Sequence, residues 1–207
     1  MNERKPIDEQ FRDIVRRVPV PTAIVAAGTG EAGGVAMTAT ALSVISTAEP
    51  TVLICLSDQG VLAPILDEGV AISINLLTMQ DAELAIAFSG EGRATASDGR
   101  WALSKADTPV LAGGLANLTG TITDLGRMGG QLIVLAAIDG LTERARAGGD
   151  KAQALMHVDG YFGLVKTLRA TTGSSSFDAK TARSRAVDRR PERALSVFSA
   201  LSRRPRS

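Results

Sequence analysis

The chain has 207 residues, and 44% of them are hydrophobic, which is enough apolar material to bury the core of a single domain. Lys and Arg number 23 against 22 Asp and Glu, so the net charge of +1 predicts neither a nucleic-acid partner nor an acidic, solvating chain. Aromatic residues make up only 3%, too few for a platform that stacks nucleic-acid bases.

Cysteine and histidine occur once each, which narrows the available chemistry. Cys55 alone excludes an intramolecular disulfide and a multi-cysteine metal site, and its apolar surroundings predict a buried, inert thiol. We assign no metal ligands. A Ser-His-Asp triad would have to use His157, and no Gly-x-Ser-x-Gly motif accompanies it.

The chain shows no targeting or membrane signal. The polar start Met1–Pro6 leads into no apolar segment of the kind found in signal peptides. The longest apolar runs have the length of strands, far short of the ~20 residues of a membrane helix. We therefore expect a soluble, cytoplasmic protein.

The first predicted elements are a helix and a β-hairpin. Apolar residues at spacings of three and four predict an amphipathic helix over 7–18, which Pro19 ends. A strand over 22–27 and a strand over 35–42 follow, joined by a glycine-rich turn over 28–34. The turn lacks the Gly-x-x-x-x-Gly-Lys-Ser/Thr pattern and leads into a strand, so it is not a phosphate loop.

The remaining chain alternates apolar runs with polar breaks. The predicted elements are, in order, a strand over 51–56, a short helix over 61–66, a strand over 70–77, a helix capped by Thr78, a long polar loop over 89–107 that contains Trp101, strands over 110–115, 117–125 and 131–141, and a strand over 155–165 broken at Asp159-Gly160. About six or seven strands with short connections, and few helices, predict an antiparallel β-barrel with peripheral helices.

The composition changes from Lys166 onward, where Ser, Arg and Ala dominate. This predicts one ordered domain over 1–165 and a mostly disordered tail over 166–207 with one short amphipathic helix. The Arg clusters of the tail suit an acidic partner or phosphate, although a solvated tail is the simpler interpretation.

Small hydroxylated residues lie between apolar strands in the stretch from Met37 to Leu77. Short hydrogen-bond donors with close backbone approach suit a flat polar heterocycle. The alternative is a pair of Thr/Ser-rich strands whose hydroxyls bond the neighbouring backbone.

Several short motifs follow one another in a defined order along residues 12–165. They are Ala36–Ala41, Val44–Ser46 with Glu49-Pro50, Ile74–Leu77 with Gln80 and Leu84-Ala85…Phe88, then Trp101, Thr108–Ala116 and His157…Gly160-Tyr161. In their order and spacing they resemble the short-chain flavin reductases, the reductase components of two-component flavin monooxygenases.

The resemblance implies the FMN-binding split barrel, a mainly β, antiparallel Greek-key split β-barrel with a few peripheral helices. It also implies an NAD(P)H:flavin oxidoreductase that uses FMN or FAD with NADH or NADPH as cosubstrate and passes reduced flavin to an oxygenase partner. Split barrels pair across the interface that forms the flavin sites, so a homodimer is implied as well.

The resemblance assigns roles to individual residues. The flavin ring would be lined by Thr38, Ala39, Thr40, Ser43 and Ser46. The phosphate-binding segment corresponds to Ser57-Asp58-Gln59-Gly60, in which Ser57 and Gln59 are the binding candidates. Asn75 ends a strand close to this cavity, and an Asn that only satisfies the strand end is the alternative.

Two positions depart from the family pattern. The family's Gly-Asp-His falls on Gly129-Gly130-Gln131, so the nicotinamide side offers Gln131, which donates a hydrogen bond but carries no charge. His157 is the second nicotinamide-side candidate, with a structural role as its alternative. Asp58 stands where relatives often place a basic or hydroxyl residue, and a carboxylate there opposes phosphate unless it points away.

These departures leave two alternatives to a flavin reductase open. One is a flavin-binding protein of the same fold without nicotinamide-dependent activity. The other is a cofactor-free split-barrel subunit that serves in interactions.

Overall fold

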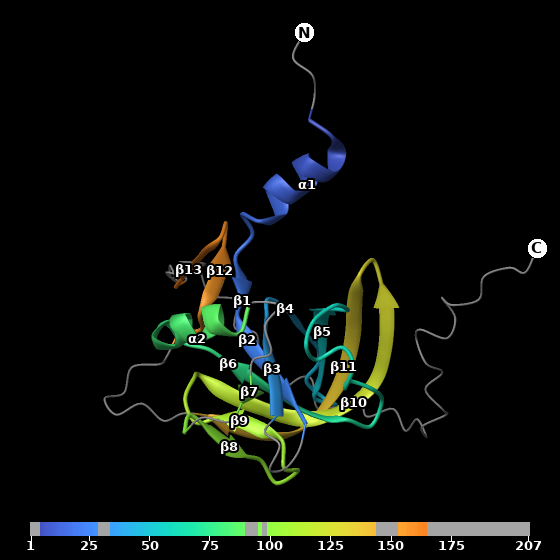
Figure 1. Cartoon of the computed structure of the whole chain (residues 1–207), viewed down its shortest axis with the longest axis vertical. Coiled ribbons are helices and arrows are strands. Elements are labelled where there is room, and N and C mark those ends of the chain that lie inside the picture. The colour runs from blue at the N-terminus through green and yellow to red at the C-terminus, as the bar shows by residue number, and fades with distance from the viewer. Residues whose placement is uncertain (1–4, 29–33, 90–94, 97–98, 144–152, 165–207) are drawn as a thin grey trace, which may run out of the picture. The chain divides into compact units, whose positions relative to one another are not determined.

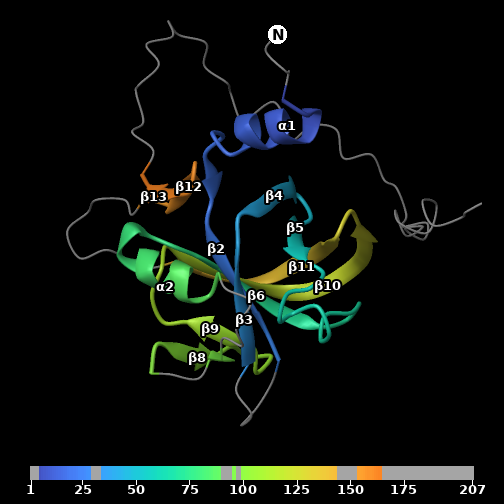
Figure 2. The ribbon, with the colours of Figure 1, turned by 45° about the horizontal axis from the view of Figure 1, so that its top comes forward.

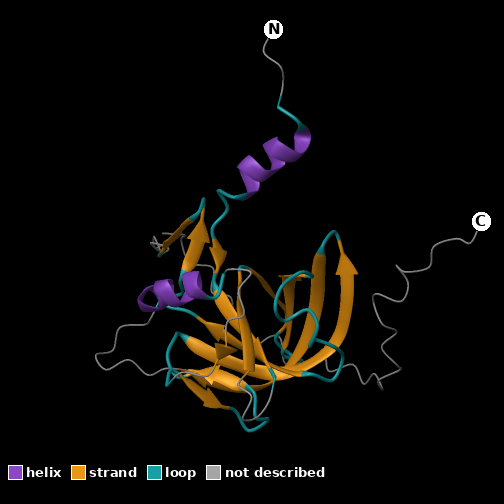
Figure 3. Ribbon diagram, in the orientation of Figure 1, coloured by secondary structure: helices purple, strands orange, loops and turns teal. Residues whose placement is uncertain are grey.

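The structure, a computed structural model, describes residues 5–28, 34–89, 95–96, 99–143 and 153–164. The predicted tail over 166–207 lies outside them. Strands dominate the described residues (Figure 3), and every pair of strands among them is antiparallel. The predicted mainly β, antiparallel architecture is therefore confirmed.

The main sheet has eight strands in the order β4-β5-β11-β10-β6-β2-β3-β7 (Figure 1). Their bounds are β2 Ala23–Ala27, β3 Gly34–Ala39, β4 Ala41–Ser46, β5 Thr51–Ser57, β6 Ala71–Leu76, β7 Thr95–Ala96, β10 Ala116–Met128 and β11 Gln131–Glu143. In Figure 2, β2, β3 and β6 run side by side, as their pairing requires. The sheet begins at β4 and ends at β7, so no closed barrel forms among the described residues.

Two smaller sheets complete the β structure of the described chain. The first contains β1 Val20–Pro21, β12 Met156–Val158 and β13 Tyr161–Gly163. Asp159 and Gly160 form the turn between β12 and β13, both with positive φ, as the sequence predicts. The second contains β8 Trp101–Leu103 and β9 Pro109–Leu111.

The helices are short. They are α1 Ile7–Val15, the 3₁₀ turn η1 Met79–Asp81 and α2 Ala82–Ala87. Thr78 begins η1 as predicted, because the Asp81 carboxylate accepts hydrogen bonds from both its N–H (2.8 Å) and its hydroxyl (2.7 Å). None of the described helices is long and apolar enough to span a membrane.

Two local predictions are wrong. Residues 61–65 form turns rather than a helix, because Pro64 has no N–H to bond the Gly60 carbonyl. Part of the predicted loop over 89–107 is strand: Trp101 begins β8 and pairs with Leu111 of β9. The pattern of residues 99–103 is too short to reveal a two-stranded ribbon from sequence.

The core forms two clusters that share β2. Ala23, Val25 and Ala27 pack in one cluster with β5, β6 and β11, whereas Ile24 and Ala26 pack in the other with α2. All five residues of β2 are fully buried. Strand β2 is therefore the wall between the two halves of the core, and its position sets that of its neighbour β3.

Asn75 of β6 joins three elements inside this core. Its Nδ2 donates to the Ile24 carbonyl (2.9 Å) and to Ser73 Oγ (3.0 Å), and its Oδ1 accepts the Leu111 N–H (2.8 Å). The side chain is 0% exposed. Because both ends of the carboxamide have partners, Asn75 links β2, β6 and β9 without leaving a buried polar group unpaired.

Asn75→Ala should lower the free energy of unfolding by roughly 2–4 kcal/mol, because it leaves the Leu111 N–H unpaired and opens a cavity in the core. Urea unfolding followed by circular dichroism measures the loss. Gln153→Ala, at an exposed position, should change stability by no more than about 0.5 kcal/mol. Equal stability of the two variants would show that Asn75 does not hold the strands together.

Candidate functional site

The junction between β3 and β4 holds the first predicted site residues. The Thr38 hydroxyl donates to the Ala85 carbonyl (2.7 Å), and the Thr38 N–H donates to the Phe88 carbonyl (2.9 Å), so the C-terminal end of α2 fixes this residue. Ala39 is buried. Thr40, between the strands, is half-buried, and its hydroxyl has no hydrogen-bond partner among the described residues. The junction thus presents one anchored hydroxyl and one free hydroxyl.

Ser43, Ser57 and Gln131 share one face of the sheet. Ser43 pairs with Leu53, and Gln131 pairs with Ser57, so each pair points to the same side of the β4-β5-β11 ribbon. The opposite face of β5 lies in the core, with Val52, Ile54 and Leu56. Three predicted residues from distant parts of the chain therefore gather on the face that turns away from the core.

The Ser57–Gly60 turn connects this face to the β3–β4 junction. A Cβ at Gly60 would lie 2.9 Å from Met37 Sδ, so the turn packs closely against the residue before Thr38. The Asp58 N–H donates to the Gly130 carbonyl (3.1 Å), which places the turn against the tip of the β10–β11 hairpin. The fold thus brings the junction, the turn and Gln131 together.

Three further candidates have partners within the fold. Ser46 Oγ accepts the Glu49 N–H (3.1 Å) in the turn after β4. Gln59 is exposed, and its Nε2 donates to Asp58 Oδ1 (3.0 Å). All polar atoms of the Asn75 carboxamide bond inside the core, which favours the structural role that the sequence leaves open for it.

His157 lies in the small sheet, away from the residues on the β4-β5-β11 face. It pairs with Val20 of β1 and Phe162 of β13. Its ring meets the Phe162 ring edge to face, with centroids 5.4 Å apart. No contact in the described residues joins His157 to Gln131, so the two nicotinamide-side candidates stay separate within one chain.

An aromatic pair that the sequence does not reveal supports the junction. The rings of Phe88 and Trp101 meet at 62° with centroids 5.6 Å apart. Phe88 is also the residue whose carbonyl accepts the Thr38 N–H. Trp101 Nε1 is buried and lacks a hydrogen-bond partner among the described residues. No local pattern in the sequence predicts this contact.

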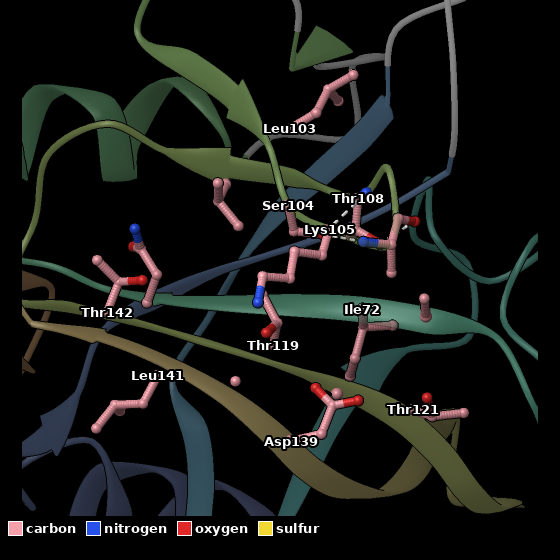
Figure 4. A pocket seen from close by; sticks show the side chains of 16 residues that line it. Ile72, Leu103, Ser104, Lys105, Thr108, Thr119, Thr121, Asp139, Leu141 and Thr142 are labelled. Atoms are coloured by element: carbon pink, nitrogen blue, oxygen red, sulfur yellow. Dashed lines mark hydrogen bonds between the residues drawn. The ribbon is translucent and has the colours of Figure 1, made fainter.

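A separate cavity of about 680 Å³ lies between the 103–108 segment and strands β6, β10 and β11 (Figure 4). Its polar lining includes Lys105, Thr108, Thr119, Thr121, Asp139 and Thr142. None of the predicted site residues lines it. Asp139 lies eight residues beyond Gln131 on β11, about 26 Å along the strand. Polar residues at alternate positions of β10 were the sequence signal for it.

The residues at the junction can bind but cannot act as acids or bases at neutral pH. The β3–β4 junction and the adjoining sheet face offer the hydroxyls of Thr40 and Ser43 and the carboxamide of Gln131. Such short neutral donors suit the carbonyl and ring-nitrogen acceptors of a flat polar ring. The arrangement therefore supports recognition of a heterocycle whose chemistry is its own.

Known proteins provide independent comparisons. The sequence pattern of the family described as "Flavin reductase like domain" matches residues 15–165. The reductase component of 4-hydroxyphenylacetate 3-monooxygenase from Salmonella typhimurium is 30% identical over 140 residues, which are 64% of this chain and 81% of that protein. FMN reductase (NADH) RutF 2 from Methylorubrum extorquens is 30% identical over 118 residues, 55% of this chain and 67% of that protein.

Solved structures show the same fold. The crystal structure of a flavin reductase domain protein from Arthrobacter sp. FB24 superposes with a TM-score of 0.70 at 18% identity, covering 80% of this chain and 99% of that one. The fold agrees with the predicted fold class, and the sequence match extends over most of the chain. On these findings, the chain belongs to the flavin reductase like domain family.

Proposed function

We propose that the protein is an NAD(P)H-dependent flavin reductase that supplies reduced flavin to a partner monooxygenase. The observation that carries the proposal is the family match over residues 15–165, which includes the hydroxyl-bearing β3–β4 junction. The relatives named as monooxygenase reductase components and as an FMN reductase using NADH support the same activity.

The residues of the junction fit the ring of a flavin. Thr40 and Ser43 carry hydroxyls without partners among the described residues, and Thr38 is held in place by α2. Hydrogen bonds from the Thr40 and Ser43 hydroxyls to the ring would stabilise the negative charge that the ring gains on reduction. Bound flavin supplies the hydride acceptor, so the chain has to bind, orient and shield the reacting rings rather than move a proton.

Gln131 is the proposed contact on the nicotinamide side. It is exposed and lies directly across from Ser57, next to the hairpin tip. Its carboxamide can hydrogen-bond a nicotinamide carboxamide, whereas it cannot supply the positive charge of an imidazolium. His157 could affect the nicotinamide side only indirectly, because it pairs with β1 and β1 in turn contacts β4.

Two alternatives rest on particular residues. A flavin-binding protein without nicotinamide-dependent activity is favoured by the neutral Gln131. A cofactor-free interaction subunit is favoured by Asp58, whose carboxylate has no ion-pair partner among the described residues.

The purified protein should bind flavin and oxidise NADH or NADPH once FMN, FAD or riboflavin is added. Loss of absorbance at 340 nm measures the oxidation, with protein omitted in the control. Flavin binding without oxidation would select the carrier alternative. Neither binding nor oxidation would select the cofactor-free alternative and sink the proposal.

Gln131→His should raise kcat/KM for the dihydronicotinamide substrate by about fivefold. The reason is that a hydrogen bond from a charged donor contributes about 1 kcal/mol more than one from a neutral donor. Gln153→His introduces the same side chain at another exposed glutamine and should leave kcat/KM unchanged. An equal response of both variants would remove Gln131 from the nicotinamide side.

We also propose that two copies of the chain pair. In α1 the apolar residues lie on one stripe and remain exposed, for example Phe11 at 66% and Ile14 at 65%. The edge strand β4 also exposes Val44 and Ile45. Beside β4 a groove of about 430 Å³ continues this apolar surface with Leu118, Ile138 and Leu141. A second copy supplies matching apolar surface by symmetry.

Light scattering should give a mass of about 43 kDa in solution, twice the 21.5 kDa of one chain. Phe11→Glu places a charge in the apolar stripe of α1 and should shift the protein toward the monomer. Arg12→Gln changes the net charge by the same amount outside the stripe and should leave the dimer intact. A wild-type protein that runs as a monomer would refute pairing.

A further inference from the structure

The backbone N–H groups of Asp58, Gln59 and Gly60 in the Ser57–Gly60 turn are already hydrogen-bonded within the protein. The Gln59 N–H donates to Ser57 Oγ (3.2 Å), and the Gly60 N–H donates to the Ser57 carbonyl (3.0 Å). The Asp58 N–H donates to the Gly130 carbonyl (3.1 Å). Phosphate sites in proteins depend on free backbone N–H groups or on cationic side chains. The N–H groups of these three residues are already engaged.

The side chains of the turn add negative charge. Asp58 is half-buried, and its only hydrogen bond among the described residues comes from Gln59 Nε2 (3.0 Å). On the described strands β5, β10 and β11 the only cation is Arg127. Arg127 pairs with Leu132, which pairs with Leu56, so it belongs to the core-facing register and not to the face of Ser57.

A polyol chain suits this turn better than a phosphate does. Hydroxyl groups can donate hydrogen bonds to the Asp58 carboxylate and to Ser57 Oγ, both of which accept. A phosphate group carries a charge of about −1.5 to −2, and a phosphate bound at this turn would be repelled by the half-buried Asp58 carboxylate. The turn therefore favours a ligand end that is neutral and rich in hydroxyls.

We propose that this site prefers riboflavin, which ends in a ribityl chain without phosphate, over FMN and FAD. The inference rests on the proposed function, since it requires that the flavin ring lies at the β3–β4 junction with its side chain toward the Ser57–Gly60 turn. Asp58 is the residue that sets this preference, and the closed turn offers the phosphate no compensating N–H group from Asp58, Gln59 or Gly60.

Titration of the full-length protein with riboflavin and with FMN, followed by quenching of flavin fluorescence, tests the preference without any variant. Riboflavin should bind at least about tenfold more tightly at low ionic strength. The difference should shrink as NaCl is raised to 0.5 M, because salt screens a partly exposed carboxylate. Tighter binding of FMN at every salt concentration would overturn the proposal.

Asp58→Asn removes the charge and keeps the shape. It should tighten FMN binding by about tenfold and change riboflavin binding by less than about twofold. Glu143→Gln is the matched control, because it removes the same charge at the far end of β11, roughly 40 Å along the strand from Gln131. It should leave the ratio of the two dissociation constants unchanged.

The outcomes separate this inference from the proposed function. If both flavins bind and Asp58→Asn leaves their ratio unchanged, the preference is not set at this turn and only this inference fails. If neither flavin binds to the wild-type protein, the proposed function itself fails, and this inference with it.

Discussion

The hydrogen bonds of Asn75 fix the positions of β2, β6 and β9, and the candidate site depends on this placement. Strand β2 pairs with β6 on one edge and with β3 on the other, so a displacement of β2 is passed directly to Thr38. Both faces of β2 are packed, which leaves no direction in which it can shift without opening a cavity. A buried polar contact thus determines where exposed hydroxyls lie.

Burial enforces the position of Gln131 in a similar way. Leu132, Val134 and Ala136 are buried on the core side of β11, and they alternate with Gln131 and Ile133. A slip of β11 by one residue would expose the whole apolar set and turn Gln131 inward. The tight turn at Gly129 and Gly130, both with positive φ, completes this register.

Local signals predicted much of the fold. The strand predicted from the apolar run over 51–56, the cap at Thr78 and the Asp159-Gly160 turn each depend on residues close together in sequence, and each is confirmed. The predicted helix over 61–66 failed because one proline outweighs the helical spacing of its neighbours. Non-local contacts could not be predicted. Ser57 and Gln131 face each other from positions more than 70 residues apart, and only the strand pairing reveals it.

The structure also connects two positions that depart from the family pattern and lie far apart in the sequence. Asp58 stands at the expected phosphate end and Gln131 on the expected nicotinamide side, yet the Asp58 N–H bonds to Gly130, the residue immediately before Gln131. Any rearrangement of the turn that freed this N–H for an anion would break the contact at the hairpin tip. The turn and the hairpin tip therefore form one structural unit. The turn carries the Asp58 carboxylate, and the neighbouring hairpin carries the neutral carboxamide of Gln131. The two departures agree with each other, because neither residue brings an unpaired positive charge to this part of the protein.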